Sequence, residues 1–154
     1  MMNKTIVIIG AGKGISYETA KNFGLKGYNV ALISRTLTSL QKLESDLAAH
    51  GIAAKGFQGD VSSESSMKNA LSEVRAAFRD EIEVFLYNAA SIRPGQPTAI
   101  SVEDFVYDFK VNVAGALADV QEILPFMKKE SGSILLTGGG LEKPHLQPES
   151  GTDS

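Results

Sequence analysis

Five short apolar runs, separated by longer amphipathic segments, restrict the possible folds of this 154-residue chain more than any other feature. The apolar runs predict β-strands at residues 4–10, 28–34, 53–60, 82–90 and 132–140. The segments between them predict helices at residues 15–27, 37–51, 63–78 and 101–129. Apolar strands that alternate with helices are typical of a parallel sheet with helices on both faces. Right-handed crossovers then predict an α/β, doubly wound sheet with strand order 3-2-1-4-5.

Several residues mark the expected ends of the helices. Gly27 and Gly51 follow the first two helices and are expected to stop them. Ser62 or Ser63 is the expected N-cap of the third helix, and Pro125 is expected to bend or shorten the long segment. The second helix is expected to bury a face of leucines, namely Leu37, Leu40, Leu43 and Leu47.

The length supports one domain, which we place at residues 1–140. The remaining residues, 141–154, are mostly polar, contain two prolines and have no periodicity. We therefore expect a loop or a disordered tail there.

The composition excludes several classes of function. The net charge is −3, so there is no basic excess for binding nucleic acid. Without cysteine the chain has no disulfides and no thiolate metal ligands, and neither His50 nor His145 has a partner at metal-ligand spacing, so we expect no metal site. No apolar run is long enough to span a membrane and no signal peptide is recognisable, so we expect a cytoplasmic protein without a membrane partner.

Three glycines, Gly10, Gly12 and Gly14, lie between the first strand and the first helix. A helix N-terminus offers free N–H groups and a partial positive charge, so this loop predicts an anion-binding site. The P-loop pattern does not fit, and Ile15 occupies the third glycine position of G-x-G-x-x-G. Two patterns remain: G-x-G-x-G, which resembles the S-adenosylmethionine-dependent methyltransferases, and G-x-x-x-G-I, which resembles the short-chain dehydrogenases/reductases.

The end of the second strand favours the dehydrogenase pattern with NADP(H) as cofactor. Methyltransferases and NAD enzymes normally place a carboxylate there to bind ribose hydroxyls. This chain has Ser34 and Arg35 instead, 21 residues after Gly14. A guanidinium suits a 2′-phosphate, and Lys13 in the glycine loop could add a second positive charge.

Further segments, in the same order, strengthen the resemblance to the short-chain dehydrogenase/reductase family over residues 4 to about 140. "GDVSS" matches its Asp-Val pair, which implies Asp60 and Val61 beside the adenine, although Asp60 alone could equally cap the next helix. "YNAA" matches the end of its fourth strand, and "KVNVAGAL" matches the segment that carries its catalytic asparagine, here Asn112. The resemblance implies a Rossmann-like NADP-binding domain at 1–140 and hydride transfer between NADP(H) and a small-molecule carbonyl or alcohol substrate. The implied cofactor-binding residues are Gly10, Gly12, Lys13, Gly14, Ile15, Ser34, Arg35, Asp60, Val61, Asn88, Ala89 and Ala90.

Other positions depart from the family pattern. Ser16 replaces a glycine, and Gly138 and Gly139 occupy the place of two serines, the second of which polarises the substrate. Thr137 has a hydroxyl, but strand alternation is expected to point it to the other face.

The family's proton-donating Tyr and the Lys four residues later have no match near the end of the sequence. The sole Tyr-x-x-x-Lys, at Tyr17 and Lys21, falls on the first helix, at the pyrophosphate end of the cofactor site. We therefore expect a chain truncated after the fifth strand and catalytically incomplete. The alternatives are a non-catalytic NADP(H)-binding or interaction protein and, ranked lower, a methyltransferase.

The helix predicted at 101–129 is expected to lose its usual neighbour and to expose an apolar stripe. We therefore expect a homo-oligomer that assembles through this helix. The stripe consists of Val102, Phe105, Val106, Phe109, Val113 and Leu117.

Overall fold

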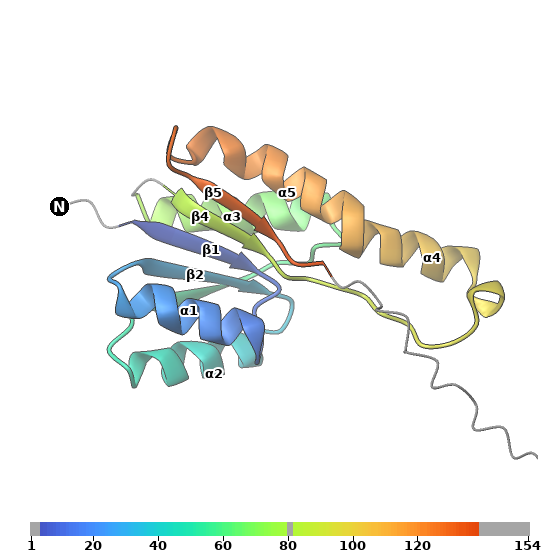
Figure 1. Ribbon diagram of the computed structural model, residues 1–154, viewed down its shortest axis with the longest axis horizontal. Helices are drawn as coiled ribbons and strands as arrows, with labels where there is room; N and C mark the ends of the chain where they lie inside the picture. Colours follow the sequence, from blue (N-terminus) through green and yellow to red (C-terminus); the bar gives the residue numbers. More distant parts are fainter. Residues whose placement is uncertain (1–3, 80–81, 139–154) are drawn as a thin grey trace, which may run out of the picture.

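The computed structural model describes residues 4–79 and 82–138. They form a five-stranded parallel sheet in the order β3-β2-β1-β4-β5, which confirms the predicted order (Figure 1). The strands are β1 (Thr5–Ile9), β2 (Asn29–Ser34), β3 (Ala54–Gln58), β4 (Ile82–Tyr87) and β5 (Ser133–Leu136). Gly139 and the segment predicted to be a polar tail lie outside the described residues.

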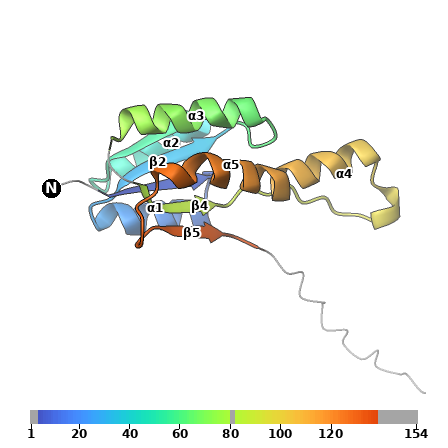
Figure 2. The same cartoon turned by 90° about the horizontal axis from the view of Figure 1, so that it is seen from above.

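Helices cover both faces of the sheet, as the apolar strands require. One face packs against α1 (Ile15–Leu25) and α2 (Leu37–Ala48), and the other against α3 (Glu64–Ala77) and α5 (Gly115–Ile123). Figure 2 shows α1 and α3 on opposite sides of the strands. Successive residues of β1 alternate between the two cores: Ile6 and Ile8 face α1 and α2, whereas Val7 and Ile9 face α3 and α5.

The helix ends differ from the predictions in detail. The first helix ends at Leu25, and Gly27 follows it in a left-handed conformation, with φ of 89°. Ser63 caps α3 by accepting a hydrogen bond from the Ser66 amide at 3.3 Å. The prediction for Leu37 is wrong: this first residue of α2 is 50% exposed, while the other three leucines of that face are buried.

The segment predicted as one long helix contains several pieces. It comprises α4 (Val102–Phe109), a π-helical turn (Lys110–Ala114), α5 and a short 3₁₀ turn (Leu124–Phe126). Pro125 lies in the 3₁₀ turn, so the α-helix ends before it, as predicted. The π-helical turn was not predicted. A second 3₁₀ turn (Pro97–Ala99) precedes α4.

Exposed apolar side chains gather on α4, α5 and β5. Figure 1 shows α4 extending past the end of the sheet. All six side chains of the predicted stripe are exposed, by 45 to 79%. Within the described part of the chain β5 is an edge strand, and its three apolar side chains are also exposed. No described helix is long and apolar enough to cross a membrane.

Candidate nucleotide-binding site

A cavity of about 280 Å³ lies at the carboxyl ends of the central strands, where ligands bind in doubly wound sheets. Seven of the predicted cofactor-binding residues line it: Gly10, Ser34, Arg35, Val61, Asn88, Ala89 and Ala90. Five lining residues were not predicted: Ile33, Gly59, Ser91, Tyr107 and Val111. The predicted residues outside this lining are Gly12, Lys13, Gly14, Ile15 and Asp60.

The glycine loop leaves room for a phosphate group. Gly10 has φ of 80°, and a Cβ there would lie 2.6 Å from the Ala89 backbone nitrogen, so a larger residue would clash. By contrast, Cβ atoms at Gly12 and Gly14 would meet no atom within 4 Å. Ile15 begins α1, whose N-terminus has no side-chain cap. The loop therefore combines open space with uncapped helix N–H groups, and these suit the pyrophosphate of a dinucleotide.

Ser16 connects the glycine loop to the strands. Its hydroxyl donates to the Gly10 carbonyl at 3.0 Å and accepts from Nδ2 of Asn88 at 2.7 Å. The backbone amide of Asn88 donates to the carbonyl of Ile9 in β1 at 2.9 Å, so this residue ties the two central strands together. The serine at the family's glycine position therefore fits and adds two hydrogen bonds.

Thr137 lies one residue past β5 and also joins this network. Its hydroxyl donates to Oδ1 of Asn88 at 2.7 Å and lies 3.2 Å from the Tyr87 carbonyl. Thr137 does not line the cavity, so its hydroxyl supports Asn88 and does not itself face the cavity.

Arg35 lies in the cavity wall directly after β2, where the sequence predicted it. Its Nη1 donates to the hydroxyl of Tyr107 at 3.1 Å, and its backbone carbonyl accepts from Nε2 of Gln58 at 3.0 Å. No carboxylate side chain lines the cavity within the described residues. Lys13 is exposed and forms no polar contact with the described part of the chain.

Asp60 uses its carboxylate within its own turn. Oδ1 accepts from the Ser62 amide at 2.9 Å and from the Ser62 hydroxyl at 2.7 Å. Since Ser63 caps α3, the capping alternative for Asp60 is wrong. Its neighbour Val61 lines the cavity, whereas Asp60 lies just outside the lining.

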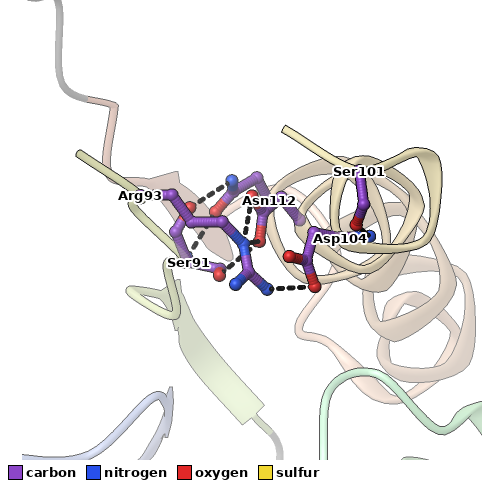
Figure 3. A network of polar contacts seen from close by, with 6 residues as sticks. Ser91, Arg93, Ser101, Asp104 and Asn112 are labelled. Carbon is purple, nitrogen blue, oxygen red and sulfur yellow. Dashed lines mark hydrogen bonds and ion pairs between the residues drawn. The ribbon is translucent and has the colours of Figure 1, made fainter. Parts of the chain in front are cut away.

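Asn112 lies in the π-helical turn and holds the loop that follows β4 (Figure 3). Its Oδ1 accepts from the Ser91 amide and its Nδ2 donates to the Ser91 carbonyl, both at 2.8 Å. Asp108 accepts from the Ser91 hydroxyl at 2.6 Å and from Nε of Arg93 at 2.9 Å. Arg93 also pairs with Asp104 at 3.4 Å. This network fixes the loop against α4, and the Asn112 side chain lies outside the cavity lining.

Two buried polar side chains lie beneath the site. Tyr87 donates its hydroxyl to the carbonyl of Val111 in the π-helical turn. Burial raises the pKa of Tyr87, and the charge of Asp119 raises it further. Asp119 is 2% exposed, and its Oδ2 has no hydrogen-bond partner within the described residues. Burial, followed by the charge of Glu122, raises the pKa of Asp119 to about 7.

Sequence reasoning did not single out Tyr107 or Asp119. Tyr107 lies next to the apolar stripe, and Asp119 resembles any charged residue of an exposed helix. Their partners, Arg35 and Tyr87, are 72 and 32 residues away along the chain, so no local pattern could reveal these contacts.

The parallel sheet, the glycine loop and the cavity at the strand ends define an α/β domain of the dinucleotide-binding type. The family model described as "short chain dehydrogenase" matches residues 4–143. The chain belongs to this family, whose members bind nicotinamide cofactors, and the lower-ranked methyltransferase interpretation is wrong.

Individual relatives are similar over most of this chain. A cis-2,3-dihydrobiphenyl-2,3-diol dehydrogenase from Pseudomonas sp. (strain KKS102) is 29% identical over 140 residues, which cover 88% of this chain and 49% of the relative. A human 3-oxoacyl-[acyl-carrier-protein] reductase is 27% identical over 141 residues, which cover 91% of this chain and 57% of the relative. The chain thus spans about half the length of the curated relatives it matches.

Solved structures share the fold. A short-chain dehydrogenase/reductase from Serratia marcescens BCRC 10948 has a TM-score of 0.82 at 18% identity. The match covers 90% of this chain and 56% of that one. An actinorhodin polyketide ketoreductase with NADPH has a TM-score of 0.75 at 22% identity. This match covers 79% of this chain and 46% of the ketoreductase chain. At these identities the likeness concerns the fold alone.

Proposed function

We propose that the cavity binds NADP(H) in preference to NAD(H), as the nucleotide-binding part of an oxidoreductase that interconverts carbonyl compounds and alcohols. The observation that carries the proposal is the Arg35 guanidinium in the cavity wall after β2, in the absence of any carboxylate among the described lining residues. When bound, the cofactor supplies or accepts the hydride. The residues of this chain bind and orient it.

Each part of the cofactor has matching chemistry in the chain. The uncapped N-terminus of α1 and the open space at Gly12 and Gly14 suit the pyrophosphate. Arg35 suits the 2′-phosphate, with Lys13 as a second cation that has no partner within the described residues. The small side chains of Ala89 and Ala90 leave space beyond β4.

Replacing Arg35 with Asp is expected to abolish the preference for NADPH. A charged hydrogen bond to phosphate contributes about 1.5–3 kcal/mol, so NADPH should bind roughly ten- to 150-fold more weakly, whereas NADH should bind no more weakly. Isothermal titration calorimetry with each cofactor measures this. Arg79→Asp, two residues past the end of α3, makes the same charge change at an exposed residue outside the cavity lining and should leave both affinities unchanged. Equal wild-type affinities for NADH and NADPH, or an unchanged NADPH affinity in Arg35→Asp, would contradict the proposal.

A second candidate function is NADP(H) binding without catalysis. Within the described residues, Gly138 and Thr137 stand near the expected place of the substrate-polarising serine, and the Thr137 hydroxyl is engaged with Asn88. The side chain of Asn112 is likewise engaged with Ser91. These observations favour a chain that binds cofactor and lacks part of the proton-transfer machinery.

We further propose that the chain forms homo-oligomers through the apolar stripe of α4 and α5. Burying such side chains against a second copy removes them from water at about 25 cal/mol per Å² of apolar surface. Phe105→Asp combined with Phe109→Asp is therefore expected to shift a dimer to a monomer in light scattering at micromolar concentration. Leu25→Asp, at the equally exposed end of α1, is the control and should not change the mass. A wild-type chain that remains a stable monomer would show that this surface does not drive assembly.

A further inference from the structure

We infer that Tyr107 is a second ligand of the 2′-phosphate and so determines cofactor specificity together with Arg35; this inference rests on the proposed binding of NADP(H). Both side chains line the same cavity, although they come from the end of β2 and from α4. Their hydrogen bond, 3.1 Å long, brings two donor groups to one point of the wall.

The direction of this hydrogen bond leaves the phenolic proton available. A guanidinium has donors and no acceptor, so in this pair the Tyr107 oxygen must accept. The hydroxyl hydrogen of Tyr107 then needs an acceptor of its own, and no described residue provides one. A phosphate oxygen beside Arg35 would accept from both the guanidinium and the hydroxyl.

Arg93, in the loop after β4, lies beside the ring of Tyr107. The guanidinium of Arg93 lies 5.8 Å from the centre of this ring. Arg93 pairs with Asp104 (Figure 3). It also pairs with Asp108, and both carboxylates lie on α4, as does Tyr107. The carboxylate of Asp108 is thereby neutralised by an ion pair of 2.9 Å, which reduces its repulsion of an anion nearby. Arg93 is thus committed to carboxylates, so of the two guanidinium groups beside Tyr107 only that of Arg35 remains for a phosphate.

The test compares ligands with and without the 2′-phosphate. Calorimetric titrations of the wild type and Tyr107→Phe would use NADPH, NADH, adenosine 2′,5′-bisphosphate and 5′-AMP. We expect Tyr107→Phe to weaken NADPH and the bisphosphate about tenfold, the effect of one hydrogen bond to a charged group, and to leave NADH and 5′-AMP unchanged. Tyr28→Phe, at the opposite end of β2, is the matched control and should change no affinity.

Each outcome discriminates between the inference and the proposal on which it rests. A wild type that prefers NADPH, with the same preference in Tyr107→Phe, would overturn the role of Tyr107 alone. Equal weakening of NADPH and NADH would also overturn it, because the hydroxyl would then act on the shape of the cavity. A wild type without any preference for the 2′-phosphorylated ligands would overturn the proposed cofactor and the role of Tyr107 together. Thermal unfolding of Tyr107→Phe, expected to match the wild type, confirms that the variant is folded.

Discussion

The purified 154-residue chain is expected to bind NADPH and yet to reduce aldehydes and ketones about 10²–10⁴-fold more slowly than a family member with its proton donor in place. This factor is the usual contribution of general acid catalysis. Reduction of a carbonyl requires a proton for the forming alkoxide as the hydride arrives. The family's Tyr is followed by a Lys four residues later, whereas the one tyrosine in the described cavity lining, Tyr107, is followed at that spacing by Val111, and no lysine lines the cavity.

The one Tyr-x-x-x-Lys of the sequence cannot replace them. Tyr17 and Lys21 lie on α1, and Tyr17 packs against the apolar core between α1, α2 and the sheet. Neither residue lines the cavity. The Asn112 side chain cannot replace them either, because its amide does not titrate and is held by two hydrogen bonds to the backbone of Ser91.

Turnover is measured by following NADPH absorbance with a panel of aldehydes and ketones. Steady turnover by the purified chain, abolished in Asn112→Ala, would contradict catalytic incompleteness. Because Asn112 holds the loop after β4, NADPH binding by this variant must be titrated in parallel. Turnover that appears only when a second polypeptide supplies Tyr and Lys would support the binding role of this chain.

The second large effect is expected in the pH dependence of stability, through Asp119. This residue of α5 is buried, and the pKa of about 7 of its carboxyl group compares with an ordinary value of 3.8. Glu64 and Lys110 line a second cavity with it, and Glu122, one turn along the helix, pairs with Arg75. Deprotonation of Asp119 therefore places an unpaired charge in the core.

The free energy of unfolding is expected to fall as the pH rises, because the folded chain binds Asp119's proton more tightly than the unfolded chain does. Between about pH 4 and pH 7 the folded chain keeps a proton on Asp119 that the unfolded chain has lost. The contribution of this group to the free energy of unfolding is complete below pH 4, falls as the pH rises and is lost above pH 7. The shift in the pKa of Asp119, about three units, corresponds to a loss of about 4 kcal/mol in the free energy of unfolding.

Asp119→Asn should remove this dependence, because the amide stays neutral. The variant is expected to match the wild type near pH 4 and to be more stable by up to about 4 kcal/mol at pH 8. Urea unfolding at a series of pH values measures the free energy of unfolding of both chains. In the difference between them, the titration of the other carboxylates cancels, because both chains contain them. Asp46→Asn, at an exposed position of α2, should follow the wild type at every pH. A constant difference between Asp119→Asn and the wild type would show that Asp119 does not titrate in this range.

The sequence alone determined the architecture, and it predicts a nucleotide-binding site at the carboxyl ends of the central strands. Strand and helix periodicities are local properties, so the apolar runs and the glycine stops predicted the elements and the strand order. The loop from Gly10 to Ile15 and the position of Arg35 were also predictable from local sequence, because a strand end followed by a helix start is encoded in contiguous residues. In the structure Gly10, Arg35 and Asn88 line one cavity.

Tertiary packing decided the contacts between side chains. Ser16 and Asn88 are 72 residues apart, as are Arg35 and Tyr107, and Thr137 reaches Asn88 across 49 residues. Periodicity could not predict the π-helical turn, the exposure of Leu37 or the burial of Asp119, since each depends on which neighbour covers a given helix face. A hydrogen bond or a desolvated carboxyl group depends on distances of a few tenths of an ångström, and only the folded arrangement of distant segments sets these distances.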